Sequence, residues 1–248
     1  MTLPYTPVAD GENPVPTIDV VIPAYNEESS LPLVLSAIPS PPVRRVIVAD
    51  NNSTDSTAEL ARDAGAIVVP APRQGYGSAC LSGLEYLRSH QPPEVVVFLD
   101  GDYSDHPEEL PQVIEPILQG KAEMVIGSRT LGNRQRGALL PQARAGNLIA
   151  CTLMRLLYGH RYTDLGPFRA ITWKALERLE MNDPNFGWTA EMQVKALRRG
   201  IRVAEVPVSY RKRVGVSKIT GTLKGTVMAG YKILYTVFRY ALERPSAP

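Results

Sequence analysis

The sequence predicts an α/β fold in which a mostly parallel sheet is flanked by helices, with a helical elaboration in the second half. Three observations predict it. Short apolar runs rich in β-branched residues alternate with helix-like stretches over the first half, which is typical of a parallel sheet with crossover helices. Polar clusters follow four of the runs, where such a sheet gathers them along one edge. The 248 residues, 44% of them hydrophobic, suffice for one large core.

The first half supplies five expected strands, at residues 17–23, 45–49, 66–70, 94–99 and 122–126. The helices expected between them lie near residues 28–38, 56–64, 77–90 and 108–119. Ser56 and Glu59 have the spacing of a capping box, and Pro107 suits the first position of a helix. After about residue 127 the pattern predicts helices near 141–158, 173–180, 188–199 and 218–243, with one strand at 202–209.

The chain divides into a leader, one large domain and a final helix. The leader, residues 1–16, is rich in proline and has no secretory signal pattern, which indicates an extended segment. Residues 17–217 form the predicted domain, and residues 218–243 form a C-terminal amphipathic helix that is part of it or attached to it. Every stretch of eighteen residues contains a charge or other polar residues, so the chain is not expected to span a membrane by itself.

Charge and cysteine content exclude two classes of protein. The net charge of +2, without a long basic block, argues against a nucleic-acid partner. Cys80 and Cys151 lack the spacing of a metal site and are expected to be reduced, buried residues of a cytoplasmic protein.

The final helix has a wide apolar arc. Its charged residues Lys224, Lys232, Arg239 and Glu243 fall within about one quadrant of a helical wheel. Such an arc suits a helix lying on a membrane surface or packing against a partner, including a second copy of the chain. Burial against the sheet is the alternative.

The stretch VVVFLDGDYSDHPEEL, residues 95–110, brings three carboxylates to the end of one buried strand: Asp100, Asp102 and Asp105. Like charges this close repel one another, and a bound divalent cation is the usual compensation. The alternative is a solvated acidic turn before a helix N-terminus.

A series of motifs resembles glycosyltransferase family 2, with its GT-A (Rossmann-like) fold. In chain order the motifs are PAYNEE, DNNSTDST, RQGYGSA, DGD, GSR, DLGPFRAI, GWTAEMQVKALRRG and RKRVGVSK, and the resemblance covers about residues 17–235. Within the family the chain is most similar to the polyprenyl-phosphate and dolichyl-phosphate hexose synthases. The resemblance implies an inverting hexosyltransferase that uses a UDP- or GDP-linked sugar, works at the cytoplasmic membrane face and transfers to polyprenyl phosphate.

The resemblance also assigns a donor site. The residues implied to bind the donor nucleotide are Pro23, Ala24, Tyr25, Glu27, Asp50 and Arg73. Asp100 and Asp102 would bracket the diphosphate, with Asp102 binding Mg²⁺ or Mn²⁺ directly because hard cations favour oxygen ligands. Either Ser104 or Asp105 would complete the metal shell. His106 is a ligand or, as we favour, a helix N-cap.

Basic residues are the candidates for holding phosphates, because guanidinium groups match phosphate oxygens. Besides Arg73, they are Arg129, Arg169, Arg211, Lys212, Arg213 and Lys218, with the hydroxyl of Ser217 nearby. The resemblance implies that residues 211–218 form a mobile loop that closes on the diphosphate and the acceptor phosphate. A solvated basic turn is the alternative.

The acceptor decides whether a catalytic base is needed. A phosphate oxygen is already anionic at neutral pH, whereas a hydroxyl must lose a proton to a carboxylate. Asp164 and Glu191 are the candidate catalytic bases, and Glu191 falls where relatives that glycosylate hydroxyls often place theirs. Either could instead orient sugar hydroxyls or satisfy a helix end.

Three functional hypotheses remain. The first is transfer of a hexose to polyprenyl phosphate. The second is a soluble family 2 enzyme that glycosylates a hydroxyl of a small molecule or glycan. The third is a nucleotide-sugar-binding protein without turnover, or a nucleotidyltransferase of similar sheet topology; the latter usually has a glycine-rich basic loop where this chain has PAYNEE.

Overall fold

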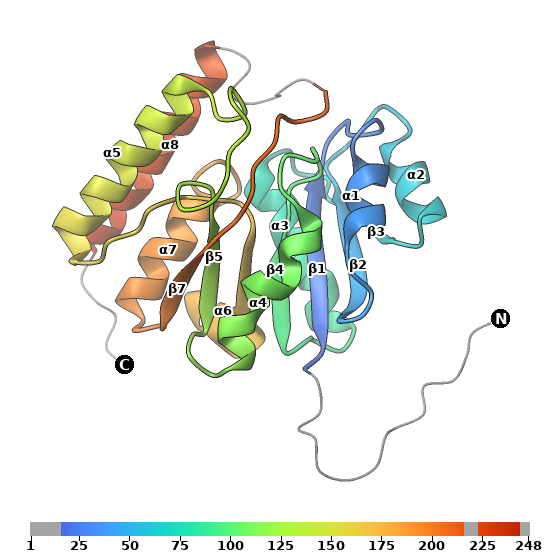
Figure 1. The fold of residues 1–248 in the computed structure, drawn as a ribbon, viewed down its shortest axis with the longest axis horizontal. Coiled ribbons are helices and arrows are strands. Elements are labelled where there is room, and N and C mark those ends of the chain that lie inside the picture. Colours follow the sequence, from blue (N-terminus) through green and yellow to red (C-terminus); the bar gives the residue numbers. More distant parts are fainter. Residues whose placement is uncertain (1–15, 216–222, 244–248) are drawn as a thin grey trace, which may run out of the picture.

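The computed structural model describes residues 16–215 and 223–243, and Figure 1 shows a sheet with helices packed on both sides. The strands are β1 (Ile18–Ala24), β2 (Val43–Asp50), β3 (Ile67–Pro70), β4 (Val95–Phe98), β5 (Met124–Ser128), β6 (Arg169–Thr172) and β7 (Val203–Pro207). The helices are α1 (Leu31–Ala37), α2 (Thr57–Asp63), α3 (Tyr76–Ser89), α4 (Leu110–Leu118), α5 (Pro141–Tyr158), α6 (Trp173–Leu179), α7 (Trp188–Arg198) and α8 (Leu223–Leu242). The predicted leader lies outside the described residues except for Pro16.

The strands of the described sheet follow the order β3-β2-β1-β4-β6-β5-β7. Neighbours β1, β2, β3 and β4 pair in parallel, and so do β5 and β7. The predicted class, a mostly parallel sheet flanked by helices, is therefore confirmed. Because β1, β2 and β4 lie side by side, the turns that follow them meet at one edge.

Strand β6 is missing from the sequence prediction. It lies antiparallel between β4 and β5, and Arg169 stands opposite both Phe98 and Ile126. The strand begins with a charged side chain and has only four residues, too few for an alternation of apolar and polar residues to be recognised. Its insertion separates β4 from β5, which would otherwise be neighbours.

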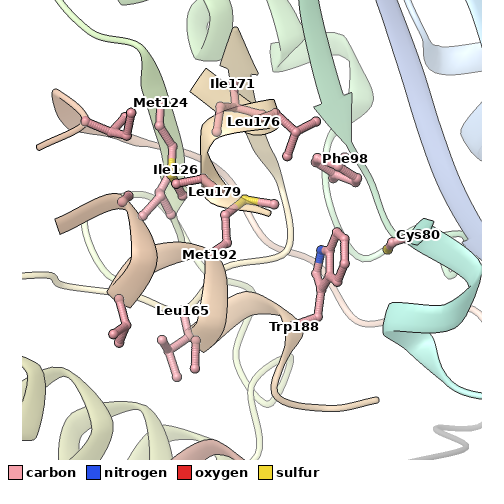
Figure 2. Close-up of a cluster of buried hydrophobic side chains, with 14 of the residues drawn as sticks. Cys80, Phe98, Met124, Ile126, Leu165, Ile171, Leu176, Leu179, Trp188 and Met192 are labelled. Atoms are coloured by element: carbon pink, nitrogen blue, oxygen red, sulfur yellow. The ribbon is translucent and has the colours of Figure 1, made fainter. Parts of the chain in front are cut away.

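Two apolar clusters cover the two faces of the sheet. Successive side chains of a strand point to opposite faces; Val20 of β1 therefore packs toward α1 and α4, and Val21 packs toward α3 and α7. Figure 2 shows the second cluster, where the rings of Phe98 and Trp188 meet edge to face with centroids 6.0 Å apart. Cys80 lies in this cluster, and both Cys80 and Cys151 are buried and unpaired, as predicted.

Two predicted helix starts differ in outcome. The prediction of a capping box at the start of α2 is wrong. Ser56 makes no capping hydrogen bond, and Asp55 instead accepts a hydrogen bond from the Thr57 N–H at 3.0 Å. Pro107 does begin a helical turn, a 3₁₀ turn that leads into α4. His106 occupies the N-cap position, but its ring contacts Glu108 at 2.8 Å and caps no backbone group.

Helices α5 and α8 pack side by side on one flank of the molecule, and α8 also contacts α7 (Figure 1). The described helices include none that is long and apolar enough to cross a membrane. The final helix is thus held on the α/β domain through two neighbouring helices.

Candidate active site

A cavity of about 300 Å³ opens at the carboxyl edge of β1, β2 and β4. Its lining includes seven of the predicted site residues: Pro23, Ala24, Tyr25, Glu27, Asp100, Asp102 and Arg213. They come from the end of β1 and the turn after it, from the turn after β4 and from the segment after β7. The first turn of α3 adds Tyr76 and Ala79 to the lining. We call this cavity the DGD pocket, after residues 100–102 at its base.

Asp50 and Arg73, predicted to bind the nucleotide, do not line the DGD pocket, but Asn51, the residue after Asp50, does. The buried Asn51 amide accepts a hydrogen bond from the Gly75 N–H and donates one to the carbonyl of Arg73, both at 2.8 Å. It thereby fixes the loop that leads into α3. Sequence reasoning missed Asn51, although the DNNSTDST motif contained it. One buried oxygen of Asp50 has no partner among the described residues, so it can accept a hydrogen bond from a ligand.

Asp100 and Asp102 have different partners. Asp100 accepts a hydrogen bond from the Tyr76 hydroxyl at 3.0 Å. Burial and the nearby charge of Asp102 raise the pKa of Asp100 to about 6. Asp102 accepts hydrogen bonds from the backbone and hydroxyl of Ser104 and pairs with Arg213 at 2.7 Å. The Ser104 hydroxyl is therefore engaged by Asp102.

Asp105 provides a test of the divalent-cation prediction. Both of its carboxylate oxygens are buried and lack a hydrogen-bond partner among the described residues. Burial, reinforced by the charge of Asp100, raises the pKa of Asp105 well above its usual range. A hard cation would bind these oxygens and relieve the repulsion, so the residues fit Mg²⁺ or Mn²⁺. Within the described chain, no three His, Cys, Asp or Glu side chains form a ready metal cluster.

The basic segment after β7 runs along the acidic turn. The Arg211 guanidinium lies 3.5 Å from the centre of the Tyr103 ring and donates hydrogen bonds to the carbonyls of Tyr103 and Asp105, each at 2.9 Å. Arg213 reaches the DGD pocket itself through Asp102. Ser217 and Lys218, predicted to bind phosphate, lie outside the described residues.

Arg129 and Asp164 are bound to each other. Asp164 is fully buried and accepts three hydrogen bonds from Arg129, two from its guanidinium and one from its N–H, all at 2.8 Å. Burial acts to lower the pKa of Arg129, but the charge and hydrogen bonds of Asp164, together with Tyr210 and Asp105, raise it well above its usual value. These contacts do not fit the predicted catalytic base, because the carboxylate is already neutralised. Asp164 instead orients Arg129 over the Tyr210 ring, at 5.1 Å.

Glu191, the second predicted base, lies away from the DGD pocket. It is fully buried and pairs with Lys195 at 2.8 Å. It also accepts hydrogen bonds from the Tyr240 hydroxyl and the Asp183 N–H, both at 2.8 Å. A carboxylate enclosed in this way cannot reach an acceptor hydroxyl, so the geometry argues for a structural role.

Arg169, predicted to bind phosphate, is also fully buried. Its guanidinium donates hydrogen bonds to the carbonyls of Leu165, Gly166 and Thr189. Burial lowers its pKa to about 10. The side chain therefore braces the turn before β6, and its donors are not directed at a phosphate.

A second cavity, of about 590 Å³, lies along α5 and the loops on either side of it. Its lining contains no Asp or Glu but includes four arginines, Arg134, Arg144, Arg155 and Arg161. Their side chains form no ion pair within the described part of the chain. We call it the arginine pocket. Sequence reasoning missed it; the available signal was that Arg144 and Arg155 lie about three helical turns apart, hence on one face of α5.

The two cavities are close neighbours. Tyr210 forms isolated bridges both with Asp105, beside the DGD pocket, and with Arg134, in the lining of the arginine pocket. Thr163 lines the arginine pocket immediately before Asp164, the partner of Arg129. The segment around Tyr210 and Arg129 therefore separates an acidic pocket from a basic one.

Comparisons with known proteins identify the family and the fold. The sequence model of glycosyl transferase family 2 matches residues 19–179. An uncharacterized glycosyltransferase of Mycobacterium tuberculosis is 38% identical over 214 residues, which cover 86% of this chain and 94% of that protein. A dolichyl-phosphate hexose transferase of Haloferax volcanii is 34% identical over 202 residues, which cover 81% of this chain and 85% of that protein. A crystal structure of glucosyl-3-phosphoglycerate synthase from M. tuberculosis, with Mn²⁺, UDP-glucose and phosphoglyceric acid, is similar with a TM-score of 0.74 and 26% identity. The match covers 93% of this chain and 82% of that one.

Proposed function

Because the chain belongs to glycosyl transferase family 2 and has its GT-A fold, we propose that this glycosyltransferase moves a hexose from a UDP- or GDP-linked sugar to polyprenyl phosphate. The anomeric carbon would be displaced directly by a phosphate oxygen, with inversion. A divalent cation, Mn²⁺ or Mg²⁺, is the cofactor that the neighbour structures support. The reaction would take place where the lipid acceptor lies, at the cytoplasmic face of a membrane.

The DGD pocket is the donor site in this proposal. Pro23, Ala24 and Tyr25 form a wall for the nucleotide, and Asp102 and Asp105 would hold the cation. The bound cation supplies a counter-charge for the leaving nucleoside diphosphate. Arg213, which lines the pocket, would contact the diphosphate oxygens, since a guanidinium group matches them in shape and charge.

The state of both candidate bases is consistent with a phosphate acceptor. Arg129 neutralises Asp164, and Lys195 and Tyr240 enclose Glu191. A hydroxyl acceptor would require one of them to take a proton, whereas a phosphate oxygen attacks as an anion. The acceptor that needs no base therefore fits the described carboxylates best.

The observation that carries the acceptor assignment is the arginine pocket beside an exposed apolar surface. On α5, Leu148 is 68% exposed and lines that pocket, and Leu156 is 74% exposed. Together with further exposed side chains of α5 and α8, they form an apolar face: Leu148, Ile149, Leu156, Leu157, Val227, Met228, Tyr231, Tyr235, Phe238 and Leu242. Unpaired arginines next to such a face suit an acceptor with an anionic head and a long apolar tail, held at a membrane surface.

A second acceptor class is favoured by the solved structures. The similar glucosyl-3-phosphoglycerate synthase binds phosphoglyceric acid, a small phosphorylated molecule. The arginines would suit the charge of this molecule equally well. The apolar face of α5 and α8 would then pack against a second copy of the chain rather than against a membrane. The two acceptors therefore predict different partners for the same face.

The test is release of free nucleoside diphosphate from a panel of UDP- and GDP-hexoses with Mn²⁺. Each donor is incubated alone, with a short polyprenyl phosphate in detergent, and with 3-phosphoglycerate. Release that requires the lipid and retains its pH profile in Asp164→Asn and Glu191→Gln supports the proposal. Release that requires 3-phosphoglycerate, together with a dimer in sedimentation, would support the second class. Metal-dependent nucleotide binding without release from any donor would indicate a binding protein.

A further inference from the structure

The last helix is connected to the wall of the DGD pocket through one loop. Residues 180–187 join α6 to α7, and Phe186 of this 180–187 loop lines the pocket near Gly75 and Tyr76. Helix α8 packs on α7, immediately after the loop (Figure 1). Two side chains of α8 contact the polar groups that hold the loop.

The first contact is an ion pair between Lys232 of α8 and Asp183 of the loop, at 3.0 Å. Asp183 is 7% exposed, and its other oxygen accepts a hydrogen bond from the Asn185 N–H at 2.8 Å. A Cβ atom on Gly187 would lie 2.5 Å from Asp183 Oδ2 and 2.6 Å from Thr236 Oγ1. Only glycine at this position allows α8 to approach the loop so closely.

The second contact uses Glu191, whose carboxylate has no access to the DGD pocket. It accepts hydrogen bonds from the N–H groups of Asp183, at 2.8 Å, and of Asn182, at 3.2 Å. The Tyr240 hydroxyl of α8 donates to the same carboxylate at 2.8 Å, and Lys195 balances its charge. The loop backbone is thus held by a buried carboxylate that α8 helps to satisfy.

The loop in turn packs on the first turn of α3. The Ser78 N–H donates a hydrogen bond to the Pro184 carbonyl at 2.9 Å. A Cβ atom on Gly77 would lie only 1.9 Å from the Asp183 carbonyl oxygen, so the two backbones are in direct contact. Tyr76, on the same turn, donates its hydroxyl to the pocket carboxylate Asp100. A displacement of the loop would therefore move the pocket wall.

We infer that Lys232 and Tyr240 are positioning residues for the donor. Through Asp183 and Glu191 they hold the 180–187 loop, which places Phe186 and the first turn of α3 against the nucleotide. The inference rests on the DGD pocket being the donor site, but it does not depend on which acceptor is used. It assigns α8 a second role besides its apolar outer face: it sets the affinity of the enzyme for its donor.

The test compares Lys232→Met and Tyr240→Phe with two controls, Lys174→Met on the exposed side of α6 and Glu243→Gln at the end of α8. The dissociation constants of UDP and of GDP, each with Mn²⁺, are measured by calorimetry, alongside the donor KM, the acceptor KM and kcat. Each test variant is expected to weaken nucleotide binding and raise the donor KM about fivefold to tenfold, as loss of one charge-assisted contact would. The kcat and the acceptor KM should stay as in the wild type, the controls should behave like the wild type, and Lys232→Arg should restore binding.

The outcomes separate this inference from the proposed function. If the wild type binds a nucleotide and the variants bind it equally well, even with a lower melting temperature, the two residues are only structural and the inference is overturned. A fall in kcat at unchanged donor KM would overturn it as well. If the wild type binds neither UDP nor GDP with Mn²⁺, the donor assignment itself fails. If Lys232→Met does not fold, Asp183→Asn tests the same ion pair from the loop side, with the same expected change.

Discussion

The DGD pocket and the arginine pocket are neighbours, yet they are built in different ways. The residues of the DGD pocket come mostly from short motifs that directly follow β1 and β4 and begin α3. The arginines of the second pocket are spread over residues 134–161, on a long helix and the loops around it. A site at the ends of neighbouring parallel strands can be predicted from motif order. A site on a helix flank depends on which elements pack beside it.

The largest expected effect concerns the acidic pocket. In the proposed donor site Asp102→Asn would remove a charged oxygen ligand of the cation. We therefore expect kcat to fall by about a hundredfold or more, the size typical of losing one strong electrostatic group at a reacting centre. Nucleoside diphosphate release at saturating donor and Mn²⁺ measures it. Asp63→Asn, at an exposed position of α2, is the matched control. Activity within a fewfold of the wild type would remove Asp102 from the metal site.

A smaller effect is expected in the basic pocket. Arg144→Ala combined with Arg155→Ala removes two unpaired guanidinium groups from the pocket lining. We expect the KM for the phosphate acceptor to rise about tenfold or more, because each charge-assisted phosphate contact contributes about 1.5 kcal/mol. The donor KM should not change. A steady-state series in both substrates measures the difference, with Arg62→Ala on α2 as control. A rise in the donor KM instead would show that the two pockets are not separate.

The last prediction concerns no step of the reaction and uses a chemical probe of the arginine pocket. Cys151 lines that pocket, and burial together with nearby Asp164 raises the pKa of its thiol to about 12. A raised thiol pKa means less thiolate at neutral pH, so alkylation by iodoacetamide at pH 8 should be at least about a hundredfold slower than in the urea-unfolded chain. The rate should keep rising with pH beyond 9, where an ordinary thiol levels off. Mass spectrometry of the alkylated peptide measures it, and a plateau near pH 9 would contradict the buried position.

The elements of the first half could be predicted because each depends on local sequence. The apolar run at residues 95–99 is bounded by polar residues on both sides, and its strand and its acidic turn lie where the pattern places them. Seven predicted residues line the DGD pocket for the same reason. The motifs follow β1, β2 and β4, and these three strands are neighbours in the sheet. The position of the site could therefore be predicted from the motifs alone.

Asp164, Glu191 and Arg169 stay predictions as site residues, but each has partners within the described fold that the sequence pattern does not reveal. Asp164 binds Arg129, and Glu191 binds the hydroxyl of Tyr240, 49 positions away. Arg169 uses its donors on backbone carbonyls, which no residue pattern reveals. A carboxylate or guanidinium in a family motif therefore has two uses, toward a ligand or toward the fold, and only its partners in space distinguish them.

Strand β6 has a consequence for how the chain reaches its structure. Its pairing with β4 joins Arg169 to Phe98, about seventy positions earlier, in the middle of the sheet. The pairs between β1, β2 and β3 need only the first third of the chain, whereas β5 has no sheet neighbour until β6 or β7 arrives. During synthesis the centre of the sheet must therefore wait until residue 172 has left the ribosome, and a chain released before that point leaves β4 with an open edge, the kind of exposed strand at which unfinished proteins aggregate.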